Sequence, residues 1–175
     1  MYPPGYAVYI TLARQSMNIE PLSSLDEILP VLTGCDLPVA DILASSPPQF
    51  FGFRVAGSVV AVIGLEQFQS AGLLRSLAVS PDYRGRGLAQ ELVRHVESFA
   101  ASHGVESLFL LTTTAEAFFR KRGYCTASRL EAPQAIQTTS QFSGLCPSSS
   151  AFLSKCIKRA NSGVHTDSAP AALRR

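Results

Sequence analysis

The stretch from residue 77 to residue 100, LAVSPDYRGRGLAQELVRHVESFA, constrains the fold of this chain more than any other. It joins an apolar run typical of a strand to a turn, and the turn to apolar residues at helical spacing. Gly85 and Gly87 remove side chains where the strand passes to the helix, so the backbone there can approach another molecule closely. Because a helix N-terminus exposes unpaired N–H groups, the turn predicts an anion site, to which Arg84 and Arg86 add positive charge.

A pyrophosphate is the anion that this turn suits best. The turn is not a P-loop, because no Gly-Lys-Ser/Thr follows the glycines, and its spacing is not that of the G-x-G-x-x-G motif. A surface turn with solvated arginines is the alternative that these residues alone leave open.

Length and composition fit one globular domain. A chain of 175 residues, 46% of them hydrophobic, is large enough to bury a good core. Its net charge of +2 is too mild to indicate nucleic acid or an anionic membrane as the main partner. The apolar run at residues 6–13 is too short to span a bilayer and has no basic region before it, so we expect no signal peptide and no membrane. The cysteines lack metal-site spacing, which favours reduced thiols, no bound metal and a cytoplasmic protein.

The order of expected elements predicts a mixed α/β domain, with an antiparallel meander followed by a strand–helix–strand crossover. The expected strands start at Met17 and cover residues 50–55, 58–68, 73–79, 107–112, 124–130 and 151–157, with a hairpin turn at Gly57. The expected helices start after Ser23 or Ser24, after Pro38 and at Leu88, where Gly104 ends the helix, and cover residues 115–123 and 135–142. We expect residues 1–16 to be an extension, residues 17–157 to form the domain, and residues 158–175 to be a disordered tail.

Several motifs together resemble one family. The run Arg84-Gly85-Arg86-Gly87-Leu88-Ala89 resembles the R/Q-x-x-G-x-G/A signature of the GNAT superfamily of acyl-CoA N-acyltransferases. LLRSLAVSPDY before it is similar to the family's fourth strand, and AEAFFRKRGY after it to the closing element. Within the superfamily, LRSLAV and LCPSSSAFLSK resemble amino-acid N-acetyltransferases related to N-acetylglutamate synthase. LLTTTAEAFF and AIQTTSQFSGLCPSS are similar to N-acetyltransferases associated with arsenic resistance.

The resemblance implies the GNAT fold, a mixed, mostly antiparallel sheet of about six to seven strands flanked by helices. It also implies acetyl-CoA as co-substrate, with its pyrophosphate at the turn and its pantetheine arm paired to the strand like an added strand. The residues implied at this site are Leu77, Ala78, Val79, Arg84, Gly85, Arg86, Gly87, Leu88, Ala89 and Phe118. The amide of Leu77 would stabilise the oxyanion of the acyl transfer.

Two positions depart from the family pattern. Leu73 stands where many relatives carry a glutamate as general base, and Phe119 stands where many carry a tyrosine as general acid. Glu66 on the preceding strand could act as a base through water, or it could be structural. Tyr124 or Thr114 could lie near the sulfur of the thioester.

Arg75 bears on the class of substrate. It lies on an apolar strand, so its charge needs a partner. The partner could be a substrate carboxylate, which a guanidinium binds in bidentate fashion, or an internal carboxylate such as Glu66 or Asp36.

The expected function is therefore acetyl-CoA-dependent N-acetylation of a small amino acid-like substrate, with a possible place in arsenic resistance. An acyl-CoA-binding regulatory module without catalysis is the first alternative, since the usual acid and base are missing. A protein N-acetyltransferase is the second. The expected partner is a small-molecule amine, and a homodimer is possible.

Overall fold

The computed structural model describes residues 18–44 and 47–157. The expected extension at residues 1–16 and the expected tail at residues 158–175 lie outside this range. The described residues form one seven-stranded sheet in the order β1-β2-β3-β4-β5-β7-β6. The strands are β1 Ile19–Leu22, β2 Gln49–Val55, β3 Ser58–Phe68, β4 Ala71–Val79, β5 Ser107–Thr112, β6 Cys125–Thr126 and β7 Ala151–Cys156.

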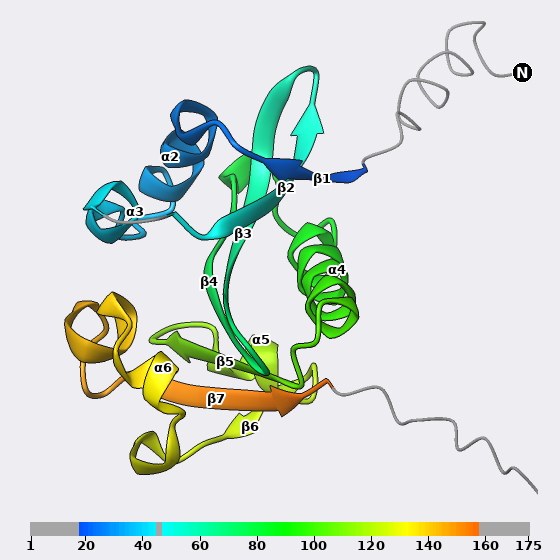
Figure 1. The fold of residues 1–175 in the computed structure, drawn as a ribbon. Coiled ribbons are helices and arrows are strands. Elements are labelled where there is room, and N and C mark those ends of the chain that lie inside the picture. The colour runs from blue at the N-terminus through cyan, green and yellow to red at the C-terminus, as the bar shows by residue number, and fades with distance from the viewer. Residues whose placement is uncertain (1–17, 45–46, 158–175) are drawn as a thin grey trace, which may run out of the picture.

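Helices cover both faces of the sheet. Figure 1 shows α4 on one face and α2, α3 and α6 on the other. The α-helices are α2 Leu25–Thr33, α3 Ala40–Ala44, α4 Leu88–Ser102, α5 Glu116–Arg120 and α6 Gln134–Gln137. Short turns of other helix types lie at Pro81–Tyr83, Arg129–Glu131 and Gln141–Leu145, the last being π-helical. The expected mixed, mostly antiparallel sheet flanked by helices is confirmed, since β4 and β5 are parallel and the other registered pairs are antiparallel.

Apolar side chains fill both sides of the sheet. The larger cluster packs α4 and Phe119 of α5 against strand residues such as Ile63, Leu74 and Leu108. On the opposite face, one cluster lies under α2 and α3, and another joins Leu73 to Ile136 of α6. Residues 60–65 of β3 and 71–75 of β4 are all buried, because the sheet is covered on both faces and successive side chains of a strand point to opposite faces.

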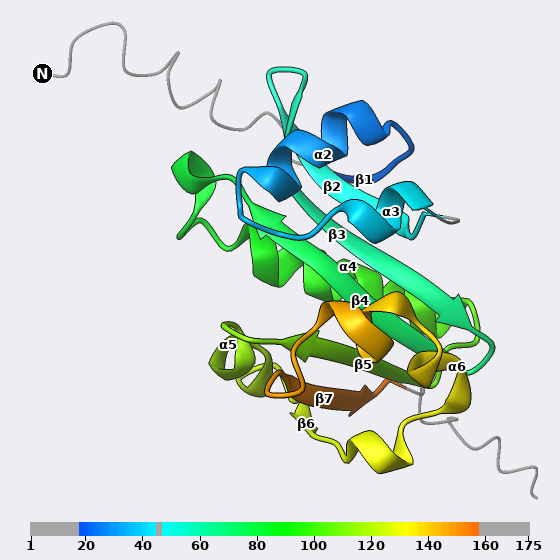
Figure 2. The same cartoon turned by 90° about the vertical axis from the view of Figure 1, so that its left-hand side faces the viewer.

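β4 pairs with β5 along only part of its length. The parallel register runs from Ala71 opposite Ser107 to Leu74 opposite Leu110. Past that point the two strands separate, as Figure 2 shows. The register of β4 with β3 also breaks there, because Ser76 and Leu77 together lie opposite Ile63, and Ser76 has a φ of 55°. This β-bulge bends β4 away from β5 and opens the sheet at its centre.

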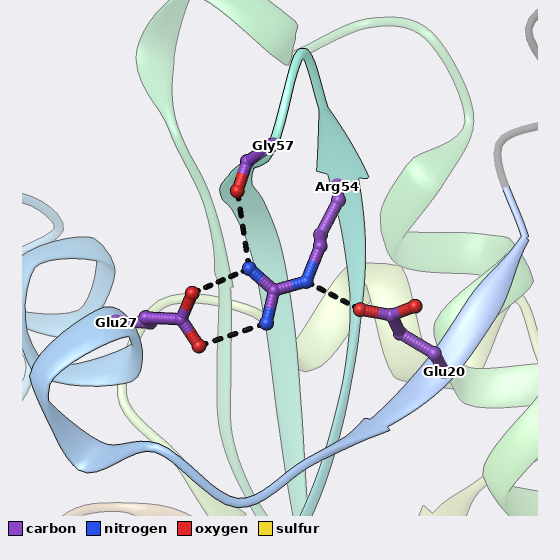
Figure 3. Close-up of polar contacts among 4 residues, drawn as sticks. All are labelled: Glu20, Glu27, Arg54 and Gly57. Carbon is purple, nitrogen blue, oxygen red and sulfur yellow. Dashed lines mark hydrogen bonds and ion pairs between the residues drawn. The ribbon is translucent and has the colours of Figure 1, made fainter.

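Arg54 joins the N-terminal elements to the β2–β3 hairpin (Figure 3). Its Nη1 and Nη2 atoms donate to Glu27 of α2, at 2.5 and 2.8 Å, and its Nε atom donates to Glu20 of β1. Nη1 also donates to the carbonyl of Gly57 in the hairpin turn, at 3.1 Å. These hydrogen bonds lower the pKa of the Glu27 carboxyl and raise that of Arg54.

The expected elements differ from the structure mainly near the C-terminal end. The strand expected at 124–130 is only Cys125–Thr126, because the chain turns there so that Ala132 packs against Leu73 and Phe152. The helix expected at 135–142 is two short pieces, α6 and the π-helical turn. β4 begins at Ala71, two residues earlier than expected, because the preceding turn ends at Ser70.

Candidate active site

A cavity of about 560 Å³ lies beside the separated end of β4. Its wall comes from β4, from the turn and first residues of α4, and from the chain that follows β5. The lining residues are Leu77, Val79, Tyr83, Arg84, Gly85, Gly87, Leu88, Ala89, Gln90, Thr114, Ala115, Phe118 and Arg122. Most of the residues predicted at the cofactor site are therefore brought together in one place.

The start of α4 is built as an open turn. Gly85 and Gly87 have φ values of 74° and 82°, which residues with side chains rarely adopt. Gly87 is the N-cap of α4, and no side chain caps this end of the helix. A Cβ atom at either glycine would meet no atom within 4 Å, so the space in front of the turn is free for a ligand. The first-turn N–H groups of α4 can therefore bind an anion in the cavity.

The two arginines of the turn point to different places. Arg84 lines the cavity, and its Nε donates to the carbonyl of Val79 at 3.0 Å. Arg86 donates to the carbonyl of Asp82 at 2.8 Å and lies 5.0 Å from the ring centre of Tyr83. Arg86 lines a separate cavity of about 520 Å³, which is also lined by His95. The geometry thus supports Arg84, more than Arg86, as a ligand of an anion in the main cavity.

The residues of β4 present backbone and apolar side chains to the cavity. Leu77 and Val79 line it, whereas Ala78 is buried on the opposite face with Val62. Because the strand alternates, only the backbone of Ala78 can face a ligand here. Phe118 of α5 also lines the cavity.

A smaller cavity of about 120 Å³ adjoins the first one. The two share Leu77, Thr114 and Ala115, and the smaller one also includes Arg75, Ser76 and Phe119. A molecule held in the large cavity and one held in the small cavity would therefore meet beside Leu77. Such an arrangement suits transfer of a group between two substrates.

Arg75 is buried and paired within the protein. Its Nη1 forms ion pairs with Asp41 of α3 and, at 2.8 Å, with Glu66 of β3. The exposed fraction of the side chain is 4% for Arg75, 5% for Asp41 and 23% for Glu66. Burial lowers the pKa of Arg75, but its hydrogen bonds to the two carboxylates outweigh this and raise the pKa overall. The geometry favours the internal ion pair over the substrate clamp, and the second partner is Asp41, not Asp36.

Glu66 does not face the acyl-transfer position. It belongs to a surface cavity with Pro47 and Phe68, and neither cavity beside Leu77 includes it. Its carboxylate is held by Arg75. The structural alternative for Glu66 therefore fits better than the role of a base acting through water.

The two residues at the positions of the family's general base and general acid, Leu73 and Phe119, are apolar and packed. Leu73 is fully buried under α6, and Phe119 lines the smaller cavity. Tyr124 lies in the core, edge-on to Phe119 at 5.3 Å, and lines neither cavity, so the geometry does not favour it as a group beside a thioester. Burial and the nearby Glu97 carboxylate raise the pKa of Tyr124. Thr114 remains a polar side chain at the junction of the two cavities.

Four residues of the large cavity were missed from the sequence. Tyr83 and Gln90 flank the glycine turn, Ala115 precedes α5, and Arg122 follows α5 in a run of basic residues. The only signal was their closeness in sequence to elements that were recognised. Across residues 18–44 and 47–157, no group of three or more His, Cys, Asp or Glu side chains could hold a metal ion. Within the same ranges, no helix has the length and apolar character needed to cross a membrane.

Comparisons with known proteins agree with this geometry. Among curated proteins, an amino-acid acetyltransferase of Pseudomonas fluorescens is 35% identical over 97 residues, which are 54% of this chain and 22% of the relative. One of Azotobacter vinelandii is 36% identical over 86 residues, 48% of this chain and 20% of the relative. The chain thus matches about a fifth of the length of these curated relatives.

Solved structures share the fold. N-acetylglutamate synthase of Neisseria gonorrhoeae, complexed with coenzyme A and N-acetyl-glutamate, superposes with a TM-score of 0.70 at 22% identity, over 82% of this chain and 35% of that one. A GNAT-family acetyltransferase of Staphylococcus aureus superposes with a TM-score of 0.65 at 15% identity, over 82% of this chain and all (100%) of that one. The sequence profile of the acetyltransferase (GNAT) family matches residues 18–124, more than half of the chain. The chain therefore belongs to the acetyltransferase (GNAT) family.

Proposed function

We propose that this protein transfers the acetyl group of acetyl-CoA to the amino group of an amino acid. The observation that carries the proposal is the large cavity, which joins the separated end of β4 to the uncapped start of α4. Family membership and the amino-acid acetyltransferases among its relatives support the same activity.

Acetyl-CoA fits this cavity in one direction. The amides of residues 84–89 would bind its pyrophosphate, with Arg84 adding a positive charge. The pantetheine arm would then run along the backbone of Leu77, Ala78 and Val79, whose edge β5 does not cover. The thioester would lie at Leu77, where the two cavities meet.

The chain supplies positioning and electrostatic stabilisation at that point. The amine attacks the thioester carbonyl, and the Leu77 N–H would donate a hydrogen bond to the oxyanion, worth about 3 kcal/mol for one such donor. Collapse of the tetrahedral species expels the CoA thiolate, and the amine loses its proton to water or buffer. Thr114 is the hydroxyl that could donate to the leaving sulfur.

The amine substrate would occupy the smaller cavity. The N-acetylglutamate synthase that shares this fold was solved with N-acetyl-glutamate, which favours an amino acid as acceptor here. The link to arsenic resistance rests on the sequence resemblance alone. Amino acid analogues that contain arsenic or phosphorus therefore belong in the substrate screen.

The proposal is tested by the release of free thiol from acetyl-CoA. We expect release in the presence of pooled amino acids to exceed release without them. An amino acid should also react faster than its decarboxylated amine. CoA binding without thiol release would indicate the regulatory module, and release with peptides only would indicate a protein N-acetyltransferase.

Two glycine variants tie that activity to the cavity. Gly87→Asp places bulk and negative charge against the phosphates, so we expect it to weaken CoA binding about tenfold or more. Gly104→Asp is the matched control, because Gly104 has a φ of 84° and equally open surroundings at the other end of α4. Equal CoA affinity of the two variants in calorimetry would contradict the assigned site.

A further inference from the structure

Among the described residues, Arg122 differs from Arg94 and Arg120 in having no carboxylate partner. Arg94 of α4 pairs with Glu91, and Arg120 of α5 pairs with Glu116. Within residues 18–44 and 47–157, Arg122 forms no ion pair, although it is partly buried. Such a cation gains more from an anionic ligand than one that is already paired.

The position of the Arg122 guanidinium is well defined. It lies 3.4 Å from the ring centre of Phe118. Its Nη1 donates to the Phe118 carbonyl at 2.5 Å, and its Nη2 donates to the side-chain oxygen of Gln90 at 3.3 Å. Its Nε is buried and makes no hydrogen bond to the described residues. Because a guanidinium carries several N–H groups, these two bonds leave donors for a further acceptor.

Arg122 and Gln90 stand between two cavities. Both residues line the large cavity, and both also line a neighbouring cavity of about 160 Å³. The other residues that line this cavity of about 160 Å³ are Val93, Arg94, Glu97 and Lys155. Its charged lining is thus three cations and one carboxylate, and that carboxylate is bonded to Lys155 at 2.7 Å. Because Arg94 pairs with Glu91 and Lys155 with Glu97, Arg122 is the cation of this lining that remains for an anionic ligand.

CoA has one phosphate group, apart from its pyrophosphate, that the glycine turn would not bind. The amides at the start of α4 suit the pyrophosphate, whereas the 3′-phosphate on the ribose is a separate dianion. We propose that Arg122, held in place by Gln90 and Phe118, binds the 3′-phosphate of CoA and makes the site selective for CoA over dephospho-CoA. This inference rests on the proposed function, since it assumes that the large cavity holds CoA.

The test compares two ligands that differ only in this phosphate. Dissociation constants of CoA and dephospho-CoA are measured by calorimetry for the unmodified protein, Arg122→Gln and Arg120→Gln. We expect the unmodified protein to prefer CoA about tenfold, the size of one hydrogen-bonded ion contact. Arg122→Gln should lose that preference by binding CoA more weakly, while its affinity for dephospho-CoA stays within about twofold. Arg120→Gln, at the last residue of α5 and outside both cavities, should keep the preference.

Each contrary result has a distinct meaning. Equal weakening of both ligands in Arg122→Gln would place Arg122 at the pyrophosphate and overturn the inference. A lack of CoA preference in the unmodified protein would overturn it without any variant, so the test does not depend on whether Arg122→Gln folds. Failure of the unmodified protein to bind either ligand would instead reject the proposed function.

Discussion

At the scale of single residues, charge pairing separates structural from ligand-binding arginines. Arg75 and Arg54 each meet two carboxylates, whereas Arg84 and Arg122 line the large cavity with donors directed at carbonyl or amide oxygens. An arginine whose guanidinium is already paired with carboxylates of the protein contributes little to the binding of an anionic ligand. The sequence context of Arg75, an apolar strand, could not distinguish these cases, because its carboxylates come from other elements.

Arg75→Leu should act mainly on stability. The substitution removes the cation that pairs with the buried Asp41 carboxylate, and removal of one partner of a buried ion pair typically costs about 3–5 kcal/mol. We therefore expect a clear fall in the free energy of unfolding, measured with urea, and CoA affinity within about twofold of the unmodified protein. Arg75→Lys should recover part of the stability, because both carboxylates pair with the single atom Nη1 and an ammonium also carries several N–H donors.

A double variant shows where the loss comes from. Adding Asp41→Asn to Arg75→Leu removes the buried charge, so part of the lost stability should return. An Arg75→Leu protein as stable as the unmodified one, but unable to acetylate amino acids, would support the substrate clamp instead.

At the scale of elements, the site depends on how β4 leaves the sheet. Sequence patterns predicted the strand, the glycine turn and the helix, because each has local propensities. They did not predict the left-handed conformation of Ser76, since a bulge is set by pairing with a strand elsewhere in the chain. The sequence patterns also did not predict the short β6 or the division of the helix near residue 137. In both places packing against Leu73 and Phe152 overrides the local preference of the chain.

The link between α2 and the β2–β3 hairpin should depend on pH. Arg54 lowers the pKa of the Glu27 carboxyl below its ordinary value of 4.5. The folded state therefore favours the carboxylate, so this stabilisation is complete above 4.5 and is lost as the pH falls below it. We expect Glu27→Gln to melt below the unmodified protein at about pH 7, and the difference between the two melting temperatures to shrink as the pH falls below 4.5.

A control variant separates this link from surface charge in general. Glu116→Gln breaks an exposed pair within α5, so it should change the melting temperature little at either pH. A Glu27→Gln difference that stayed constant from neutral to acid pH would contradict the role of ionisation.

At the scale of the whole molecule, both halves of the sheet are complete within the described residues. β1 and β6 form the two sheet edges, and the three apolar clusters that support the sheet draw on residues 19–157. The matched family profile also starts at residue 18. The proposed domain, residues 17–157, therefore has the parts that a cooperative fold needs. Location in the cytoplasm and formation of a homodimer stay predictions.

The chain of residues 17–157 should fold and bind CoA by itself. Its melting temperature should lie within about 2 °C of that of the full chain, because it keeps every residue of the three apolar clusters. Its dissociation constant for CoA should lie within about twofold, since the large cavity is intact. A fall of about 10 °C would show instead that residues 1–16 or 158–175 stabilise the domain, for example by adding a strand at the open edge of β1. Light scattering of both chains would then show whether that stabilisation comes from a dimer. If a terminal segment holds two copies together, the full chain should have the mass of a dimer and the shorter chain that of a monomer.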